Sequence, residues 1–140
     1  MPRKRMISPE IWTDAKFLKL TVKEKLVFIA CISFADDEGI LELGSESLWY
    51  RINVQPNDLS IAEYNDILGK LSKLGMIVRY DEYAFIPAWF KHQYIKHPTK
   101  SLLHRPPESI AKYYLEYLSG WYNQYKEKEY PYDNNGVTRG

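Results

Sequence analysis

The chain has 140 residues, 45% of them hydrophobic, which is enough apolar material for the core of one domain. No apolar run approaches the roughly eighteen residues of a membrane-spanning helix, and no apolar run follows the basic N-terminus as in a secretory signal. The net charge is +1, and the single cysteine, Cys31, lies in an apolar run. One cysteine cannot form an internal disulfide or a zinc site, so we expect a small buried side chain and a cytoplasmic protein.

Charge is distributed unevenly along the chain. Residues 1–25 hold seven basic and three acidic side chains, whereas residues 26–66 hold eight acids and a single base, Arg51. Residues 88–107 hold four basic side chains, all three histidines and no acid. This segregation predicts one basic and one acidic surface, and so two different partners.

The N-terminal elements have clear boundary signals. Ser8 followed by Pro9 is typical of a helix start. Thr21 and Glu24 have the spacing of a capping box, which predicts a helix from Val22 onward. Because that helix is apolar nearly all round, we expect it at the centre of the core, ending near Asp36–Gly39 with Gly39 in a left-handed conformation.

The middle of the chain alternates short strands and helices. Residues 40–43 predict a short strand, Gly44-Ser45 caps a second helix, and residues 53–59 form a connection. A second capping box, Ser60 to Glu63, opens a helix that Gly75 closes, and residues 76–87 predict a β-hairpin. The order helix, strand, helix, helix, hairpin predicts an α+β, mainly α fold: a winged helix-turn-helix with an extra C-terminal helix.

The chain changes character after Pro87. A basic and aromatic flank runs to Arg105, and Glu108 opens a last helix that continues to residue 125. We therefore divide the chain into a winged-helix domain (1–105) with a basic N-terminal arm and this flank, a C-terminal helix (106–125) and a flexible tail (126–140).

The segment Asp36-Asp37-Glu38-Gly39 could be a metal site or part of a turn. The ligand pattern of a calcium loop does not continue beyond Glu42, which makes a metal site a poor interpretation. We predict a structural role in which Asp36 or Asp37 accepts backbone hydrogen bonds or pairs with a basic side chain of the N-terminal block. The three histidines match no metal-ligand spacing.

Four segments carry a resemblance to a known family: PRKRMISPEIWTDAKFLKL (2–20), FADDEG (34–39), LGKLSKLGMIVRY (68–80) and IPAWFKHQYI (86–95). Together they resemble the N-terminal winged-helix domain of phage replication initiation proteins, the DnaD-like replisome organisers. The resemblance covers about residues 1–105. It implies a winged-helix fold, origin or single-strand DNA binding, recruitment of a helicase or its loader, and no catalytic residue. It also implies the cytoplasm of a host cell.

Such proteins usually continue into a second, DNA-binding helical domain. Here about 33 residues follow Pro107, which is enough for one helix and a tail. Three interpretations stay open: an N-terminal piece of an initiator, a stand-alone accessory protein, or a protein that blocks another.

The candidate nucleic-acid ligands combine cations for phosphates with nearby aromatic rings that stack on bases. The alternative is a solvated arm and a solvated flank, and we expect Trp89 in the core in either case. The candidates are Arg3, Lys4, Arg5, Asn65, Lys70, Lys73, Lys91, Lys96, Lys100 and Arg105.

The expected recognition helix carries Glu63 and Asp66, and the hairpin tip is also acidic, which disfavours the usual docking in a DNA groove. These acids fit a protein partner instead. The last helix carries an aromatic face that is either core packing or an interface, with a homodimer as one hypothesis. The candidate interface residues are Glu63, Asp66, Tyr113, Tyr117 and Trp121.

The leading hypothesis is a phage-type replication protein that binds single- or double-stranded DNA with weak sequence specificity and helps to assemble an initiation complex. The second is a module that binds a helicase, a loader or a host protein without DNA. The third is a transcriptional regulator. The sequence contains no phosphate loop, nucleophile elbow or catalytic set of acids and histidines, so we expect neither an enzyme nor a cofactor.

Overall fold

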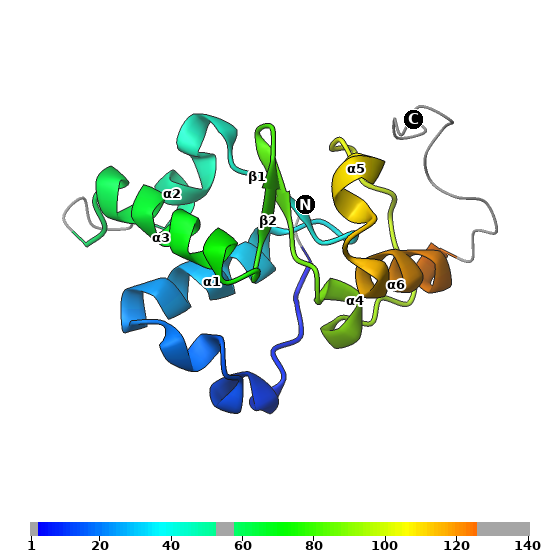
Figure 1. Ribbon diagram of the computed structural model, residues 1–140, viewed down its shortest axis with the longest axis horizontal. Helices are drawn as coiled ribbons and strands as arrows, with labels where there is room; N and C mark the ends of the chain where they lie inside the picture. The colour runs from blue at the N-terminus through cyan, green and yellow to red at the C-terminus, as the bar shows by residue number, and fades with distance from the viewer. Residues whose placement is uncertain (1–2, 53–57, 126–140) are drawn as a thin grey trace.

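The computed structural model describes residues 3–52 and 58–125, which form a mainly helical α+β fold. A three-stranded antiparallel sheet lies between two groups of helices (Figure 1). The helices of the first group are α1 (Val22–Phe34), α2 (Ser47–Ile52) and α3 (Ile61–Lys73), and on the other side lie α4 (Trp89–His92), α5 (Glu108–Ala111) and α6 (Leu115–Tyr125). None of the helices among the described residues has the length and apolar character that crossing a bilayer requires.

Two 3-10 turns precede the first helix. Ser8 caps η1 (Pro9–Thr13) by accepting a hydrogen bond from the backbone N–H of Glu10, as its sequence predicts. The following turn, η2 (Phe17–Lys19), places the Phe17 side chain completely in the core. This segment is therefore a pair of short turns rather than an α-helix.

Helix α1 begins with the predicted capping box. The Thr21 hydroxyl accepts from the backbone N–H of Glu24, whose carboxylate accepts from the backbone N–H of Thr21 at 2.7 Å. The helix ends at Phe34, two residues before the segment Asp36–Gly39 where its end was predicted, and Ala35 is already extended. Gly39 does adopt a left-handed φ of 76°, but it does so in the turn that leads into the sheet.

The sheet consists of β1 (Ile40–Glu42), β2 (Val78–Tyr80) and β3 (Tyr83–Phe85) in the order β1-β3-β2. Strands β2 and β3 form the predicted hairpin, with Tyr80 opposite Tyr83 and Asp81 in a left-handed conformation in the loop. Strand β1 pairs with β3 on its other side, with Ile40 opposite Phe85. The predicted strand at residues 40–43 is thus confirmed for its first three residues.

Helices α2 and α3 connect the first strand to the hairpin. A 3-10 turn, η3 (Gly44–Glu46), comes before α2, and the capping box from Ser60 to Glu63 is present at the start of α3. Gly75 closes α3 at φ 74°, and the N–H of Met76 bonds the carbonyl of Leu71, which is the geometry of a Schellman motif. The predicted tail at 126–140 lies wholly outside the described residues, and the predicted connection at 53–59 lies mostly outside them.

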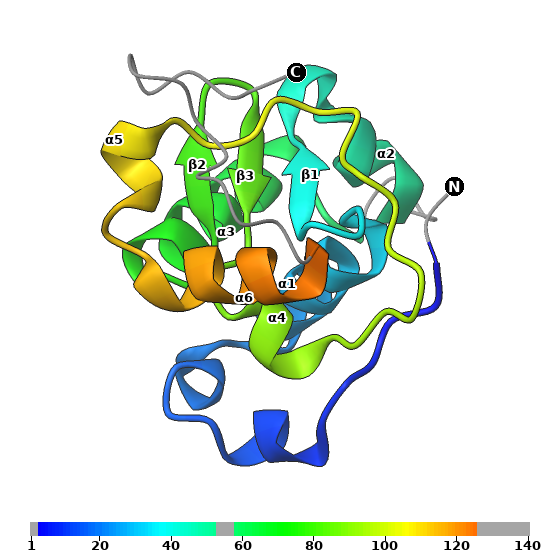
Figure 2. The ribbon, with the colours of Figure 1, turned by 90° about the vertical axis from the view of Figure 1, so that its right-hand side faces the viewer.

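Residues 93–107, here called the strap, run from α4 around the outer side of β1 and over the end of the sheet to α5 (Figure 2). The single helix predicted from Glu108 to residue 125 is wrong, because residues 112–114 separate α5 from α6. This break allows Tyr114 and Tyr117 to contact the ring of Phe85, at centroid distances of 5.4 and 4.6 Å. The C-terminal helices therefore pack on the sheet itself.

Candidate functional site: the acidic turn and the basic arm–strap face

The acidic turn, Asp36–Gly39, holds its own backbone through the first carboxylate. Oδ1 of Asp36 accepts from the N–H groups of Glu38 (2.9 Å) and Ile40 (3.0 Å), and Oδ2 accepts from the hydroxyl of Ser101. Burial raises the pKa of the Asp36 carboxyl above its ordinary value, against the opposing effect of these hydrogen bonds. The prediction that Asp36 or Asp37 bonds the backbone of the turn is confirmed.

Asp37 connects the turn to the N-terminal arm, residues 3–8. Its Oδ1 lies 2.9 Å from Nη1 of Arg5, and its Oδ2 lies 3.3 Å from Nε of Arg3. Oδ2 also accepts from the backbone N–H of Thr99 in the strap at 2.8 Å. The predicted pairing with a basic side chain of the N-terminal block is therefore confirmed, and the same carboxylate holds the strap.

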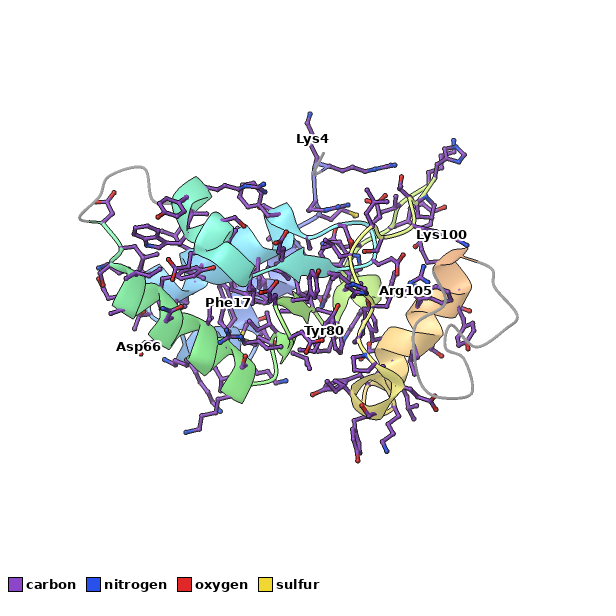
Figure 3. All side chains as sticks on the ribbon, turned by 90° about the horizontal axis from the view of Figure 1, so that it is seen from above. Lys4, Phe17, Asp66, Tyr80, Lys100 and Arg105 are labelled. Carbon is purple, nitrogen blue, oxygen red and sulfur yellow. The ribbon has the colours of Figure 1, made fainter. Side chains whose placement is uncertain are left out.

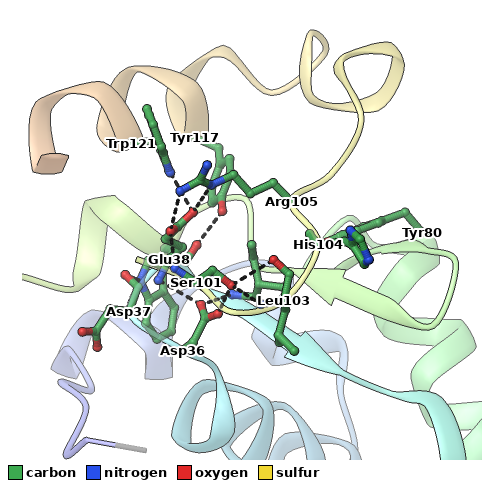
Figure 4. Close-up of polar contacts among 12 residues, drawn as sticks. Asp36, Asp37, Glu38, Tyr80, Ser101, Leu103, His104, Arg105, Tyr117 and Trp121 are labelled. Atoms are coloured by element: carbon green, nitrogen blue, oxygen red, sulfur yellow. Dashed lines mark hydrogen bonds and ion pairs between the residues drawn. The ribbon is translucent and has the colours of Figure 1, made fainter. Parts of the chain in front are cut away.

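Glu38 is completely buried, and each of its carboxylate oxygens accepts hydrogen bonds (Figure 4). Oε1 accepts from Nε of Arg105 and from Nε1 of Trp121, both at 2.8 Å, while Oε2 accepts from Nη2 of Arg105 (3.1 Å) and from the N–H of Ser101 (2.6 Å). The backbone carbonyl of Glu38 accepts from the hydroxyl of Tyr117. The Arg105 guanidinium, which donates two hydrogen bonds, and the neutral donors of Trp121 and Ser101 compensate the negative charge of the buried Glu38 carboxylate.

The arm and the strap also contact each other directly. The side-chain amide of Gln93 donates to the carbonyl of Met6 (2.7 Å) and accepts from its N–H (2.9 Å). Nη2 of Arg3 donates to the carbonyl of His97 at 3.0 Å. The arm and the strap, whose contacting residues Met6 and Gln93 are 87 positions apart and Arg3 and His97 are 94 positions apart, therefore lie side by side.

We call the surface formed at this junction the arm–strap face. Arg3 keeps 45% of its side chain exposed although it contacts Asp37. The other members lie at the surface, and Lys4 projects away from the body of the protein (Figure 3). The face comprises Arg3, Lys4, Lys96, His97 and Lys100.

The remaining predicted nucleic-acid ligands are scattered. Arg5, with 4% of its side chain exposed, stacks over the Trp89 ring, and Arg105 is held by Glu38. Lys70 bonds Glu24 at 2.7 Å and the carbonyl of Lys19. These three cations have internal partners. The structure places Asn65 and Lys73 at the surface on α3. Lys91 is at the surface on α4, two positions before Gln93, the first residue of the strap.

The residues predicted to contact a protein partner also divide into buried and exposed side chains. Tyr117 and Trp121 are 3% and 4% exposed, so their side chains belong to the interior and are not presented to a partner. Tyr113 is 74% exposed, and Asp66 is also at the surface. Glu63 caps α3 and forms an exposed ion pair with Lys23 at 3.0 Å.

Sequence reasoning missed the residues of the strap that hold it in place. Gln93, Thr99 and Ser101 bond the arm or the acidic turn, and uncharged side chains in a basic flank give no signal for such contacts. Trp89 is in the core, as predicted, and donates from Nε1 to the carbonyl of Asp37.

Two features bear on other kinds of chemistry. Cys31 is fully buried, and burial raises the pKa of its thiol to about 12, which keeps it in the unreactive thiol form. In the part of the chain that the structure describes, no group of three His, Cys, Asp or Glu side chains is arranged to hold a metal ion.

Comparison of this chain with models of known protein families, with curated proteins and with solved structures finds no match.

Proposed function

We propose that this chain is a winged-helix protein of DNA replication that binds DNA with weak sequence specificity and helps to assemble an initiation complex. The order α1, β1, α2, α3, β2, β3 and the sheet order β1-β3-β2 support a winged helix-turn-helix, with α4 to α6 as an extension. The resemblance of the four segments to phage replication initiators supports a role in DNA replication.

The observation that carries DNA binding is the contact of Arg3 with the carbonyl of His97. It joins the basic arm to the basic strap, so that the cations of the arm–strap face form one surface rather than two isolated ends. Cations in such an arrangement attract phosphates without reading bases. Tyr94 of the strap is 77% exposed and offers a ring on which a base stacks.

The expected recognition helix supports weak specificity. The exposed positions near the start of α3 include Asn65, which suits adenine, and Asp66, which repels phosphate. Asp81 and Glu82 at the hairpin tip are exposed and also acidic. Binding through the arm–strap face avoids bringing these carboxylates against the DNA backbone.

The test is fluorescence anisotropy with a labelled single strand and a duplex of equal length, at several salt concentrations. We expect the double variant Lys4→Glu/Lys96→Glu to weaken binding at least about tenfold and to flatten the salt dependence. The matched control is Lys16→Glu/Lys112→Glu, which changes the net charge equally at exposed lysines outside this face. No binding by the wild type at low salt, or an equal loss in the control, would contradict the proposal.

A second candidate is a protein-interaction module that works without DNA. The exposed carboxylates of Asp66, Asp81 and Glu82, on α3 and the hairpin tip, favour it. The test is a pull-down with a purified replicative helicase or its loader after nuclease treatment. Loss of capture in Asp66→Lys/Glu82→Lys, with DNA binding absent in the wild type, would favour this candidate.

A further inference from the structure

The outer face of α1 is apolar and exposed. Val22 is 75% exposed and Leu26 is 63% exposed, and at helical spacing the same face continues through the half-buried Ile29 and Ala30. Ser33 ends the face, and its hydroxyl donates to the carbonyl of Ile29 at 3.0 Å, so this polar group is satisfied within the helix. The face is roughly 16 Å long at the rise of an α-helix.

The core of this chain accounts for only part of that composition, because Ile29 and Ala30 pack against the core whereas Val22 and Leu26 do not belong to it. The opposite face of α1, with Val27, Phe28, Cys31 and Ile32, already fills the interior. A helix at the surface of a protein ordinarily has polar residues on its outer side, whereas α1 carries no charged residue from Leu26 to Phe34. An exposed apolar face bordered by polar groups is typical of an interaction site.

The charged side chains beside the face are mostly cations. On one side Lys23 forms an exposed ion pair with Glu63, and the Arg51 guanidinium lies over the Phe34 ring at 5.3 Å. On the other side the Lys25 ammonium lies over the Phe17 ring at 5.3 Å. Among the described residues, the carboxylate in contact with one of these three cations is that of Glu63, which pairs with Lys23.

We propose that this face of α1 is a docking site for an amphipathic helix of another protein, with an apolar stripe flanked by carboxylates. The stripe packs on Val22, Leu26 and Ile29, and its carboxylates lie beside the cations on either side. A second copy of this chain is a poor occupant, because two such faces bring cations against cations. The site shares no residue with the arm–strap face and goes beyond the proposed DNA binding.

The test uses two synthetic, covalently stapled helical peptides with the same leucine stripe, one flanked by glutamates and the other by lysines. Binding is measured by fluorescence anisotropy, and the site is mapped by amide chemical shifts of the full chain. We expect the glutamate peptide to bind and to shift the amides of α1, and the lysine peptide to bind at least about tenfold more weakly.

The variant that tests the site is Leu26→Asp, and its matched control is Leu102→Asp, because Leu102 is a completely exposed leucine of the strap. We expect Leu26→Asp to reduce binding of the glutamate peptide at least about tenfold and Leu102→Asp to leave it unchanged. Circular dichroism and thermal melting show whether each variant keeps its fold. Val22→Gln provides a second variant with the same expected loss, because Val22 is exposed on the same face and, like Leu26, lies outside the core.

Several outcomes would overturn the proposal. Equal binding of the two peptides would show that the flanking cations do not select the partner. Unchanged binding by folded Leu26→Asp would show that the peptide does not bind at this face of α1. A wild-type dimer in sedimentation that Leu26→Asp dissociates identifies a second copy as the occupant. Flotation with vesicles of phosphatidylglycerol and phosphatidylcholine, lost in Leu26→Asp, identifies a lipid surface instead.

Discussion

The carboxylate of Glu38 and the guanidinium of Arg105 form a two-pronged ion pair inside the protein, at 2.8 Å and 3.1 Å, although the two residues are 67 positions apart in the chain. The pair connects the acidic turn, which follows α1, to the end of the strap. Glu38 is completely buried and Arg105 keeps 13% of its side chain exposed. The strap is therefore held to the acidic turn by a buried charge rather than by apolar packing alone.

We expect Glu38→Gln to destabilise the fold by about 3–5 kcal/mol, because it leaves the guanidinium of Arg105 buried without its counter-charge. The measurement is urea unfolding followed by circular dichroism. The double variant Glu38→Gln/Arg105→Met removes both charges and should recover a large part of the loss. A loss below about 1 kcal/mol in the single variant would show that the pair contributes little.

Asp36 should make stability depend on pH. Its pKa is raised by burial above 3.8, so the folded state binds this proton more tightly than the unfolded chain. The contribution of this group is full below about pH 4 and is lost as the pH rises through the folded-state pKa. Asn at this position keeps the acceptor for the N–H groups of Glu38 and Ile40 without the charge.

The stability of Asp36→Asn relative to the wild type should therefore increase between about pH 4 and pH 7. Urea unfolding at several pH values measures this difference. A difference that stays constant or decreases with rising pH would contradict the assignment.

Gly39 and Gly69 provide a matched pair of glycines. Gly39 has a left-handed φ of 76°, and a Cβ there would lie 2.5 Å from Cγ of Trp89, whereas a Cβ at Gly69 meets no atom within 4 Å. We expect Gly39→Ala to cost about 2–5 kcal/mol from backbone strain and overpacking. Gly69→Ala, in the exposed face of α3, should stabilise by about 0.5–1 kcal/mol. Thermal and urea unfolding of both variants distinguish these opposite signs.

Cys31 should report global unfolding. Its side chain is completely buried and its pKa is raised to about 12, so a thiol reagent reaches it only after the core opens. We expect negligible modification in native buffer and a rate that rises with urea in parallel with unfolding. Fast modification in native buffer would contradict this burial.

The local signals in the sequence predicted local structure well. Both capping boxes, the end of α3 at Gly75 and the hairpin depend on neighbours within a few residues, and all are present. Helix α1 ends two residues before the predicted segment Asp36–Gly39, and Gly39 does not terminate it, because the side chain of Asp36 holds a turn where the glycine signal suggested a helix terminus.

The candidate site was less predictable, because a guanidinium that faces a phosphate and one that faces a buried carboxylate look alike in a sequence. Arg5 and Arg105 belong to the second kind. The partner of Asp37 in the N-terminal block was predicted from charge. The partners of Glu38 come from segments that only the tertiary fold brings near, so neither spacing nor composition indicates them.

The acidic turn also has a consequence for the time course of folding. Its partners include Arg5, 32 positions upstream, and Trp121, 83 positions downstream, so both ends of the described chain must arrive before its bonds close. Contacts of such long sequence separation carry a large loop-closure entropy and are expected to form after the transition state. Substitution of Glu38 should then accelerate unfolding while leaving the refolding rate nearly unchanged. The bonds of the acidic turn therefore act mainly by slowing the unfolding of the native state.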